Sequence, residues 1–427
     1  MDADERADVV IVGAGAAGLM AGIWAARSAP GCRVVVLDGA RLLGAKILVS
    51  GGGRCNVTHD VVDATAYAGS TRPAIAGVLR RFAVPQTVAF FRELGVELKR
   101  EDTGKLFPTT DSAKTVLHAL LTGAARAGAL VRHPCRVETV ERTAAGFRVA
   151  GPWGTLAART VILATGGKSL PKSGSDGHGF ALAQALGHTL TPQVFPALVP
   201  LLLPPDHPLC ALSGIAVPAT LELWAGTGKR LQAFTNATLC THFGLSGPAP
   251  LDISRYWTAA RLTDPATTLT IGWLPDQTPE AVDTALQGLG RTAVLTWLRA
   301  LLPDRLARTL CAVAAIDPLL PGRALTRPHR QALVRTLTRL PLPISGDRGY
   351  NYAEVTAGGI PLAEIHLPTM ESRRCPGLFL CGELCDVDGR IGGYNYQWAW
   401  ASGYVAGTSA GLKIATATRR HGDTEIL

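Results

Sequence analysis

A glycine-rich motif close to the N-terminus has the spacing of a loop that binds the phosphates of a dinucleotide. It follows the pattern G-x-G-x-x-G and comprises Gly13, Ala14, Gly15, Ala16, Ala17 and Gly18. In such a loop the first glycine permits a tight turn, the second lets the backbone approach a pyrophosphate, and the third lets a helix pack closely on a strand. Asp38 lies 20 positions after Gly18 and can accept hydrogen bonds from ribose hydroxyls. Because an acidic residue here disfavours a 2′-phosphate, the motif predicts FAD or NAD(H) rather than NADP.

The residues on both sides of this motif have the patterns that such a loop requires. Residues 8–12 and 32–37 are mostly β-branched and apolar, which is typical of strands buried on both faces of a parallel sheet. Residues 16–27 lie between them and are predicted to form a helix. The N-terminus of this helix would offer free N–H groups and a positive dipole end to the phosphates.

Three further segments that follow predicted strands contain residues able to contact a long cofactor. After the second strand the chain enters a glycine-rich loop, whereas a plain NAD dehydrogenase would continue into another helix. From this loop we predict contacts by Gly39, Gly44, Lys46, Gly52, Gly53, Arg54, Cys55 and Asn56. The strand at 160–164 is followed by Thr165, Gly166 and Gly167, and the strand at 377–381 by Gly382, Glu383, Asp388, Gly392, Gly393, Tyr394 and Asn395. Several strand-end loops around one sheet suit a cofactor as large as FAD better than NAD.

At this point the chain resembles the BaiN/YhiN-type FAD-dependent oxidoreductases, also described as aminoacetone oxidase-like flavoproteins. The resemblance covers most of the chain and rests on seven blocks in the same order, at 13–18, 50–58, 164–171, 241–248, 355–359, 369–372 and 382–395. Together with the glycine motif and Asp38 in register, it leads us to expect one non-covalently bound FAD. The family usually carries Glu where this chain has Asp38, which is a tolerable change for a ribose contact. The resemblance does not support Cys381 and Cys385 as a redox pair.

The resemblance also implies an α/β fold with a glutathione-reductase-like, Rossmann-type FAD-binding domain that is interrupted by a β-rich insert with a helical subdomain. Changes in sequence pattern place the first part of the FAD domain at 1–190, the insert at 191–345 and its helices at 278–340. The FAD domain returns at 346–412, and the polar segment 413–427 is predicted to be a frayed tail. Helices are predicted at 78–94 and, in a run of small residues, at 398–410. Val137 lies in a predicted strand at 131–140 that passes the adenine end, and residues 105–108 are predicted to form a loop over the flavin or a surface turn.

Three side chains are candidates for catalysis. Cys55 can be a reactive thiol beside Arg54, or a small buried apolar residue. His242 lies in a loop-like setting and can donate a proton to the substrate, or serve only the structure. Tyr394 can bind an anionic substrate. The helix that begins near Tyr394 can also stabilise the negative charge of a reduced flavin by its dipole.

Composition and charge limit the remaining classes of function. Of the 427 residues, 47% are hydrophobic and 18% charged, so the chain can bury a large core. The net charge of +9 permits attraction to phosphates. Its densest part is an arginine cluster at 323–339, which is either a solvated helix face or a phosphate contact. Aromatic residues make up only 6%, so nucleic acid is a disfavoured partner, although it is not excluded.

Compartment and metal content are predicted from the N-terminus and the cysteines. Residues 9–26 are apolar over a membrane-spanning length, but the start of the chain is acidic and the run contains four glycines. The nine cysteines are odd in number and scattered, which fits a reducing compartment and gives no metal-ligand spacing. The sequence therefore predicts a cytoplasmic protein without a membrane span or a metal.

These features predict an FAD-dependent oxidoreductase that transfers hydride between flavin and a small organic substrate or NAD(P)H. No second G-x-G-x-x-G motif follows the first, so NAD(P)H would be a transient donor without its own Rossmann domain. Two alternatives stay open. One is an FAD-dependent enzyme that modifies tRNA, and the other is a flavin-binding redox protein without catalysis.

Overall fold

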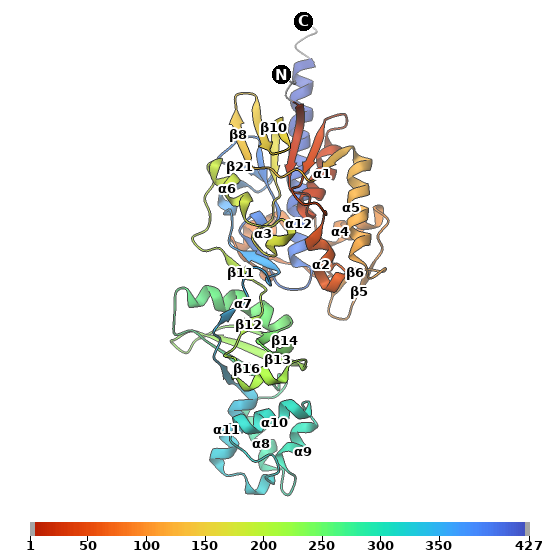
Figure 1. Ribbon diagram of the computed structural model, residues 1–427. Coiled ribbons are helices and arrows are strands. Elements are labelled where there is room, and N and C mark those ends of the chain that lie inside the picture. The colour runs from red at the N-terminus through yellow and green to blue at the C-terminus, as the bar shows by residue number, and fades with distance from the viewer. Residues whose placement is uncertain (1–4, 423–427) are drawn as a thin grey trace. The chain divides into compact units, whose positions relative to one another are not determined.

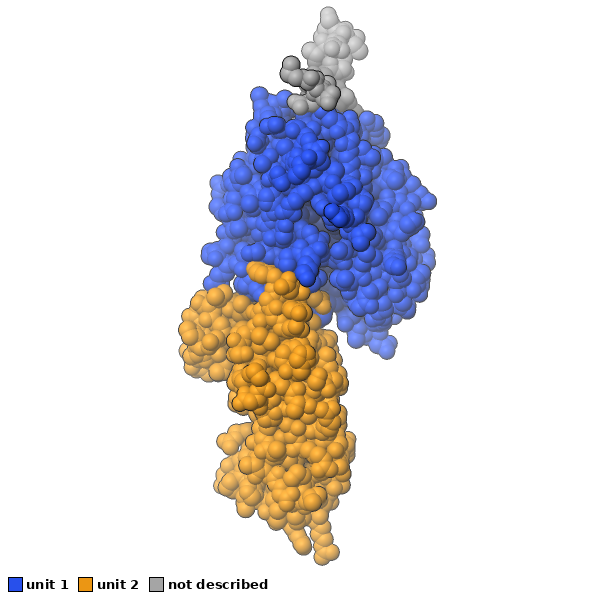
Figure 2. Space-filling view, in the orientation of Figure 1, with its two compact units in different colours: residues 1–196, 355–427 blue, residues 197–354 orange. Residues whose placement is uncertain are grey.

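The computed structural model describes residues 5–422 and contains two compact units (Figures 1 and 2). Unit 1 combines Met1–Pro196 with Val355–Leu427, and unit 2 is Ala197–Glu354. Because unit 1 is formed by both ends of the chain, unit 2 is an insertion into it. The sequence places this insertion at 191–345.

A nine-stranded sheet forms the centre of unit 1. Its parallel strands lie in the order β22 (Leu378–Leu380), β10 (Gly154–Leu163), β1 (Glu5–Val12), β2 (Val34–Leu37) and β7 (Ala129–Arg132). The antiparallel strands are β8 (Thr139–Thr143) and β9 (Gly146–Gly151) beside β10, and β20 (Ile365–His366) and β21 (Glu371–Ser372) beside β22. Residues 34–37 are all buried, as expected for an apolar strand covered on both faces.

Two helices that are far apart in sequence, α1 (Ala16–Ser28) and α12 (Tyr394–Gly422), pack together beside this sheet (Figure 1). Gly403, Gly407 and Gly411 occur every four residues of α12, on one face of the helix. A Cβ atom on any of them would lie within 2.6 Å of a backbone oxygen of α1. The close approach of the helices therefore depends on these glycines.

The helix predicted at 398–410 is longer at both ends, because α12 begins at Tyr394 and continues to Gly422. The predicted frayed tail at 413–427 is therefore wrong for residues 413–422, and residues 423–427 lie outside the described part. Two contacts explain why the helix continues: Ile414 is buried, and Lys413 forms an ion pair with Glu371 of β21.

The segment 45–127 differs from its prediction in three places. A helix expected at 78–94 is two helices, α3 (Arg72–Leu79) and α4 (Val84–Glu93), because the chain turns before the proline in the first turn of α4. The loop expected at 105–108 is β6 (Lys105–Pro108), which pairs with β3 (Thr58–His59) and β5 (Leu98–Arg100). Part of the glycine-rich loop is a kinked helix, α2 (Ala45–Gly53).

The other elements of unit 1 are β4 (Tyr67–Gly69), α5 (Ala113–Ala127), α6 (His178–Ala185), β19 (Val355–Ala357) and β23 (Val387–Gly389). Strand β11 (Phe195–Ala197) crosses the boundary of unit 1.

Unit 2 contains a seven-stranded sheet and five helices in its described residues. The strands lie in the order β17 (Leu340–Leu342), β16 (Thr268–Gly272), β13 (Ala216–Trp224), β14 (Arg230–Thr241), β15 (Gly244–Ser246), β12 (Leu201–Leu202) and β18 (Gly346–Asp347). Alternate residues of β13 are buried, since helix α7 (Pro248–Arg261) covers one face of the sheet. The remaining helices are α8 (Pro279–Gln287), α9 (Val294–Arg299), α10 (Asp304–Val313) and α11 (Arg327–Thr338).

Candidate functional site

The glycine motif lies where β1 ends and α1 begins, and its three glycines have different surroundings. A Cβ on Gly13 would lie 2.5 Å from the carbonyl oxygen of Ala164, and a Cβ on Gly18 would lie 1.8 Å from the carbonyl oxygen of Gly13. Packing therefore requires glycine at both positions. A Cβ on Gly15 would meet no atom within 4 Å. The space in front of Gly15 is open, as the approach of a pyrophosphate requires.

Asp38 follows the adjacent strand β2 and contacts the same loop. Its Oδ2 accepts a hydrogen bond from the Ala14 N–H at 2.7 Å, and its Oδ1 accepts one from the Ala40 N–H at 2.8 Å. Each carboxylate oxygen can accept a further bond, so contact with a ribose stays possible. The segment around Val137 lies close by, because the Cys135 N–H donates to the Asp38 carbonyl at 2.6 Å. Val137 belongs to the connection between β7 and β8, so the strand predicted there is wrong.

The glycine-rich segment after Asp38 crosses the same edge of the sheet. Gly44 begins α2 with a φ of 70°, and the backbone of α2 is non-helical from Ser50 to Gly52. A Cβ on Gly52 would meet no atom within 4 Å, whereas Gly39 is close to Arg136. The carboxamide oxygen of Asn56 is buried and has no hydrogen-bond partner among the described residues.

Arg54 and Cys55 do not form the reactive pair that the sequence allows. The Arg54 guanidinium lies over the Phe107 ring at 4.0 Å and pairs with Glu101 at 2.6 Å. Cys55 is fully buried, and burial raises the pKa of its thiol to about 12, although a hydrogen bond with Ser50 opposes this shift. Burial and the raised pKa both disfavour a thiolate, so they favour the packing role among the two that the sequence leaves open for Cys55.

The third loop, after β10, brings Thr165, Gly166 and Gly167 beside the return segment of unit 1. The Thr165 hydroxyl is buried and has no hydrogen-bond partner among the described residues. A Cβ on Gly167 would lie 2.5 Å from the Thr356 hydroxyl and 2.8 Å from Glu383 Oε1. Gly167 thus allows β19 and the segment after β22 to approach β10.

Lys46 and Glu383 meet in this region although they are 337 residues apart. The Lys46 ammonium lies 2.6 Å from Glu383 Oε2 and donates a hydrogen bond to the Ser169 hydroxyl at 2.8 Å. The Ser169 hydroxyl donates to Glu383 Oε1 at 2.7 Å, and the Thr356 N–H donates to the same oxygen at 2.9 Å. Both charged side chains are largely buried, with exposed fractions of 26% and 18%.

The C-terminal block lies against the first glycine loop. A Cβ on Gly382 would lie 2.8 Å from the Ala17 Cβ, and the indole N–H of Trp398 donates to the Gly382 carbonyl at 3.0 Å. The Tyr396 hydroxyl donates to the Lys46 carbonyl at 3.2 Å. The early and late motifs that the sequence assigns to one cofactor are therefore neighbours.

The residues that open α12 hold one another in place. Asn395 accepts a hydrogen bond from the Gly389 N–H and donates one to its carbonyl, at 2.7 and 2.9 Å. Tyr394 stacks on His59 with ring centres 5.0 Å apart. Gly393 has a φ of 95° and lies against the Thr58 backbone. The two remaining predicted residues, Gly392 and Asp388, are buried beside them.

His242 differs in its unit from the other predicted site residues, which all belong to unit 1. It lies in unit 2 between β14 and β15, where it is exposed and contacts the Phe243 ring edge to face at 5.0 Å. Its role as a proton donor stays a prediction.

Sequence reasoning missed Ser169, Thr356, Tyr396 and His59 as neighbours of the site. A signal was present for two of them, because Ser169 follows the Thr-Gly-Gly of the third loop and Thr356 stands in the block 355–359. No nearby sequence pattern identifies the Tyr396 hydroxyl or the His59 ring as part of the site, because their partners are distant in sequence.

The strand-end loops, the open space at Gly15 and the Asp38 carboxylate fit a bound FAD and define a flavoprotein with a Rossmann-type domain. The chain belongs to the HI0933-like Rossmann family, whose model matches residues 7–409. This confirms the family, the α/β fold class and the FAD-dependent oxidoreductase that the sequence motifs predict.

Two curated relatives match nearly the whole chain. The 3-dehydro-bile acid delta(4,6)-reductase of Clostridium scindens is 35% identical over 94% of this chain and 98% of its own length. The ribosomal RNA dihydrouridine synthase of Escherichia coli is 34% identical over 94% of this chain and 97% of its own length. Among solved structures, E. coli quinol fumarate reductase FrdA matches 96% of this chain and 71% of its own, with 17% identity and a TM-score of 0.51. This last likeness shows the fold alone.

Two further classes of feature are absent from residues 5–422. None of the helices there is both long and apolar enough to cross a bilayer. The same residues contain no group of three or more His, Cys, Asp or Glu side chains placed to hold a metal ion.

Proposed function

We propose that this protein uses FAD to reduce a carbon–carbon double bond that is conjugated to a carbonyl group. The observation that carries this proposal is that two relatives, each matching 94% of the chain, are named for reactions on such bonds. A 4,6-unsaturated 3-oxo bile acid and a uridine differ in size and polarity, but both contain an alkene polarised by a neighbouring carbonyl. We infer that this chain acts on the shared feature.

Reduction of such a bond requires a hydride at the β-carbon, a proton at the α-carbon and stabilisation of charge at the carbonyl oxygen. FAD supplies the hydride when it is bound and reduced. The chain must then orient the alkene, exclude water and supply a proton donor. His242 remains the candidate for proton donation, and Tyr394 remains the candidate for binding an anionic substrate. NAD(P)H is proposed as a transient source of electrons.

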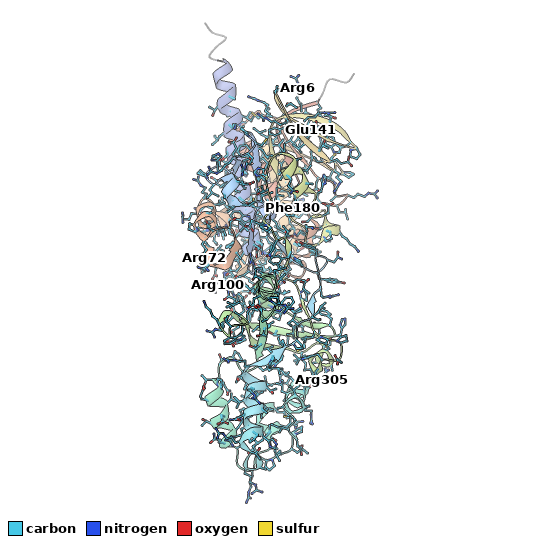
Figure 3. The ribbon with its side chains drawn as sticks, turned by 90° about the vertical axis from the view of Figure 1, so that its left-hand side faces the viewer. Arg6, Arg72, Arg100, Glu141, Phe180 and Arg305 are labelled. Atoms are coloured by element: carbon cyan, nitrogen blue, oxygen red, sulfur yellow. The ribbon has the colours of Figure 1, made fainter. Side chains whose placement is uncertain are left out.

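A small organic molecule is the first candidate substrate, and a uridine in RNA is the second. One observation favours the second. All nine basic residues between positions 278 and 340 are arginines, against four acidic residues. Arg323, Arg327 and Arg335 are exposed on or near α11. Arg305 of α10 (Figure 3) is exposed as well, but its guanidinium donates to the Ala211 carbonyl at 2.7 Å. Exposed arginines can bind phosphate oxygens through paired hydrogen bonds.

The test is an oxidative half-reaction of the FAD-loaded protein. The flavin is reduced by light under anaerobic conditions and mixed with a 3-oxo-4,6-diene steroid, a uridine-containing rRNA transcript or an alkene without a carbonyl. We expect the flavin absorbance to recover with at least one conjugated acceptor and not with the isolated alkene, and the product to gain two hydrogens. Recovery with neither conjugated acceptor, or equal recovery with the isolated alkene, would contradict the proposal.

A further inference from the structure

Lys46 and Glu383, which meet at the sheet edge, are held by more hydrogen bonds than an ordinary surface ion pair. The Glu383 carboxylate accepts from Lys46, from the Ser169 hydroxyl and from the Thr356 N–H. The Thr356 hydroxyl is itself fixed, because it accepts from the N–H groups of Lys168 and Ser169 at 2.7 and 3.0 Å. The carboxylate therefore has one orientation, set by contacts from three other segments of unit 1.

The ammonium group of Lys46 has one donor left after these contacts. It carries three N–H groups, and two of them are directed to Glu383 and the Ser169 hydroxyl. The backbone of Lys46 is held as well, because its carbonyl accepts from the Tyr396 hydroxyl in the first turn of α12. Both ends of the residue are thus fixed, and its side chain keeps 26% of its surface exposed.

This arrangement stands beside the loop that fits the cofactor. Glu383 is the neighbour of Gly382, which packs on Ala17 of the first glycine motif. Ser169 follows the loop after β10, whose Ala164 carbonyl packs on Gly13. An FAD bound along this edge would offer acceptor atoms to such a donor. The contact with Tyr396 in the first turn of α12 links Lys46 to the helix end that is expected to stabilise reduced flavin.

We propose that Glu383 and Ser169 are positioning residues that hold the Lys46 ammonium against bound FAD, and that this lysine–glutamate pair sets the reduction potential of the flavin. Lys46 donates its remaining N–H to the cofactor, and its positive charge favours the reduced state. Glu383 orients that ammonium and partly neutralises it. The inference depends on FAD binding at this edge and is independent of which double bond the enzyme reduces.

The proposal predicts opposite effects for the two partners. Lys46→Met removes the positive charge and should lower the reduction potential. Glu383→Gln removes the negative charge, keeps a side chain of the same shape and should raise the potential. A role in packing alone would impair FAD retention in both variants, with no opposite shifts. Lys46→Arg keeps the charge and should remain close to the wild type.

The experiment is an anaerobic redox titration of each FAD-loaded protein against a dye of known potential. We expect Lys46→Met and Glu383→Gln to change the reduction equilibrium about tenfold in opposite directions, or ~30 mV for a two-electron couple. Matched controls are Lys413→Met and Glu371→Gln, which break a lysine–glutamate pair 19 residues further along α12 than Tyr394. Both controls should leave the potential unchanged.

Three outcomes would overturn the proposal: unchanged potentials in both variants, shifts in the same direction, or equal shifts in the controls. If Lys46→Met does not retain FAD, Lys46→Gln provides a neutral side chain that still donates hydrogen bonds. Loss of FAD from both neutral variants would assign Lys46 to binding and reject its effect on the potential. Because no alkene is used, failure here leaves the proposed reaction intact.

Discussion

At the scale of single residues, the glycines of one loop have different roles. Gly13 and Gly18 are required by packing, whereas Gly15 faces open space. Cys55 stands in the glycine-rich segment, and its sequence setting allows both a reactive and a packing role. The neighbouring Arg54 suggests a stabilised thiolate, but its guanidinium is engaged by Glu101. The sequence identifies Arg54 but does not show which side chain its guanidinium contacts.

Cys55 should be unreactive and dispensable for chemistry. With a pKa of about 12, its thiolate fraction at pH 8 is on the order of one in ten thousand. We expect no labelling of Cys55 by iodoacetamide in the folded protein, measured by peptide mass spectrometry, and rapid labelling after denaturation. Cys55→Ala should retain the bound flavin and its turnover. Rapid labelling of native Cys55, or loss of turnover with normal FAD content, would restore the reactive thiol.

At the scale of elements, the strand–loop–helix unit around the glycine motif could be predicted because all of its signals are local. The βαβ pattern, the glycine spacing and Asp38 stand within 40 residues. The pairing of α1 with α12 could not be predicted in detail, since residues nearly 400 positions apart form it. The glycine repeat of α12 was visible as a run of small residues, but its partner was not.

The α1–α12 contact predicts opposite effects of one substitution at two helical glycines. A Cβ on Gly407 would lie 2.3 Å from the Ala21 carbonyl oxygen, so Gly407→Ala should destabilise the protein by about 1–3 kcal/mol. Gly77 of α3 meets nothing within 4 Å, so Gly77→Ala should stabilise the protein by roughly 0.5–1 kcal/mol. Urea unfolding followed by circular dichroism measures both. A Gly407→Ala protein as stable as the wild type would reject the close contact.

A buried histidine links the β20–β21 hairpin to the end of α6 and makes stability depend on pH. His188 Nδ1 lies 2.8 Å from Glu364, and Nε2 lies 2.7 Å from the Ser372 hydroxyl. Burial lowers the pKa of His188, although Glu364 opposes the shift. Burial would raise the pKa of Glu364, but hydrogen bonds from Thr189, His188 and Arg374 outweigh it and lower the pKa.

Both shifts make the folded state lose stability on acidification. Below about pH 6.5 the unfolded His188 binds a proton before the folded one does, and below about pH 4.5 Glu364 adds to the loss. We expect the melting temperature to fall between pH 7 and pH 5. His188→Gln should have a lower melting temperature at pH 7 and a flatter pH dependence. An equally steep dependence in this variant would assign the effect to other groups.

At the scale of the whole molecule, the motifs and their order along the chain indicate the class of protein, but not the contacts between its two ends. The sequence indicates the insertion of unit 2 by a change of pattern, and α10 falls within the predicted helical range 278–340, whereas α7 is not predicted. The contact between Lys46 and Glu383 spans 337 positions and depends on the folding of both ends of the chain into one unit. No local pattern encodes such a pair.

The arginines of unit 2 provide a test of the RNA candidate. If RNA is the substrate, its affinity should fall linearly with salt on logarithmic axes. The triple variant Arg323→Gln, Arg327→Gln, Arg335→Gln should reduce that slope by ~2, at about 0.7 per single-strand phosphate contact. The control is Arg299→Gln with Arg308→Gln, since both arginines pair with Asp304. Equal slopes in the triple variant and the wild type would exclude this surface.

The central claim is that FAD binds at the edge of the unit 1 sheet marked by the first glycine loop. The most direct test is the FAD content and affinity of Gly15→Val beside the wild type. Gly15 has a φ of −77° and open space at its Cβ, so the substitution should leave the melting temperature of the FAD-free protein unchanged. We predict stoichiometric FAD in the wild type and at least about tenfold weaker binding in the variant, or ~1.4 kcal/mol. Equal FAD affinity in the two proteins would contradict the assignment of this loop to the cofactor.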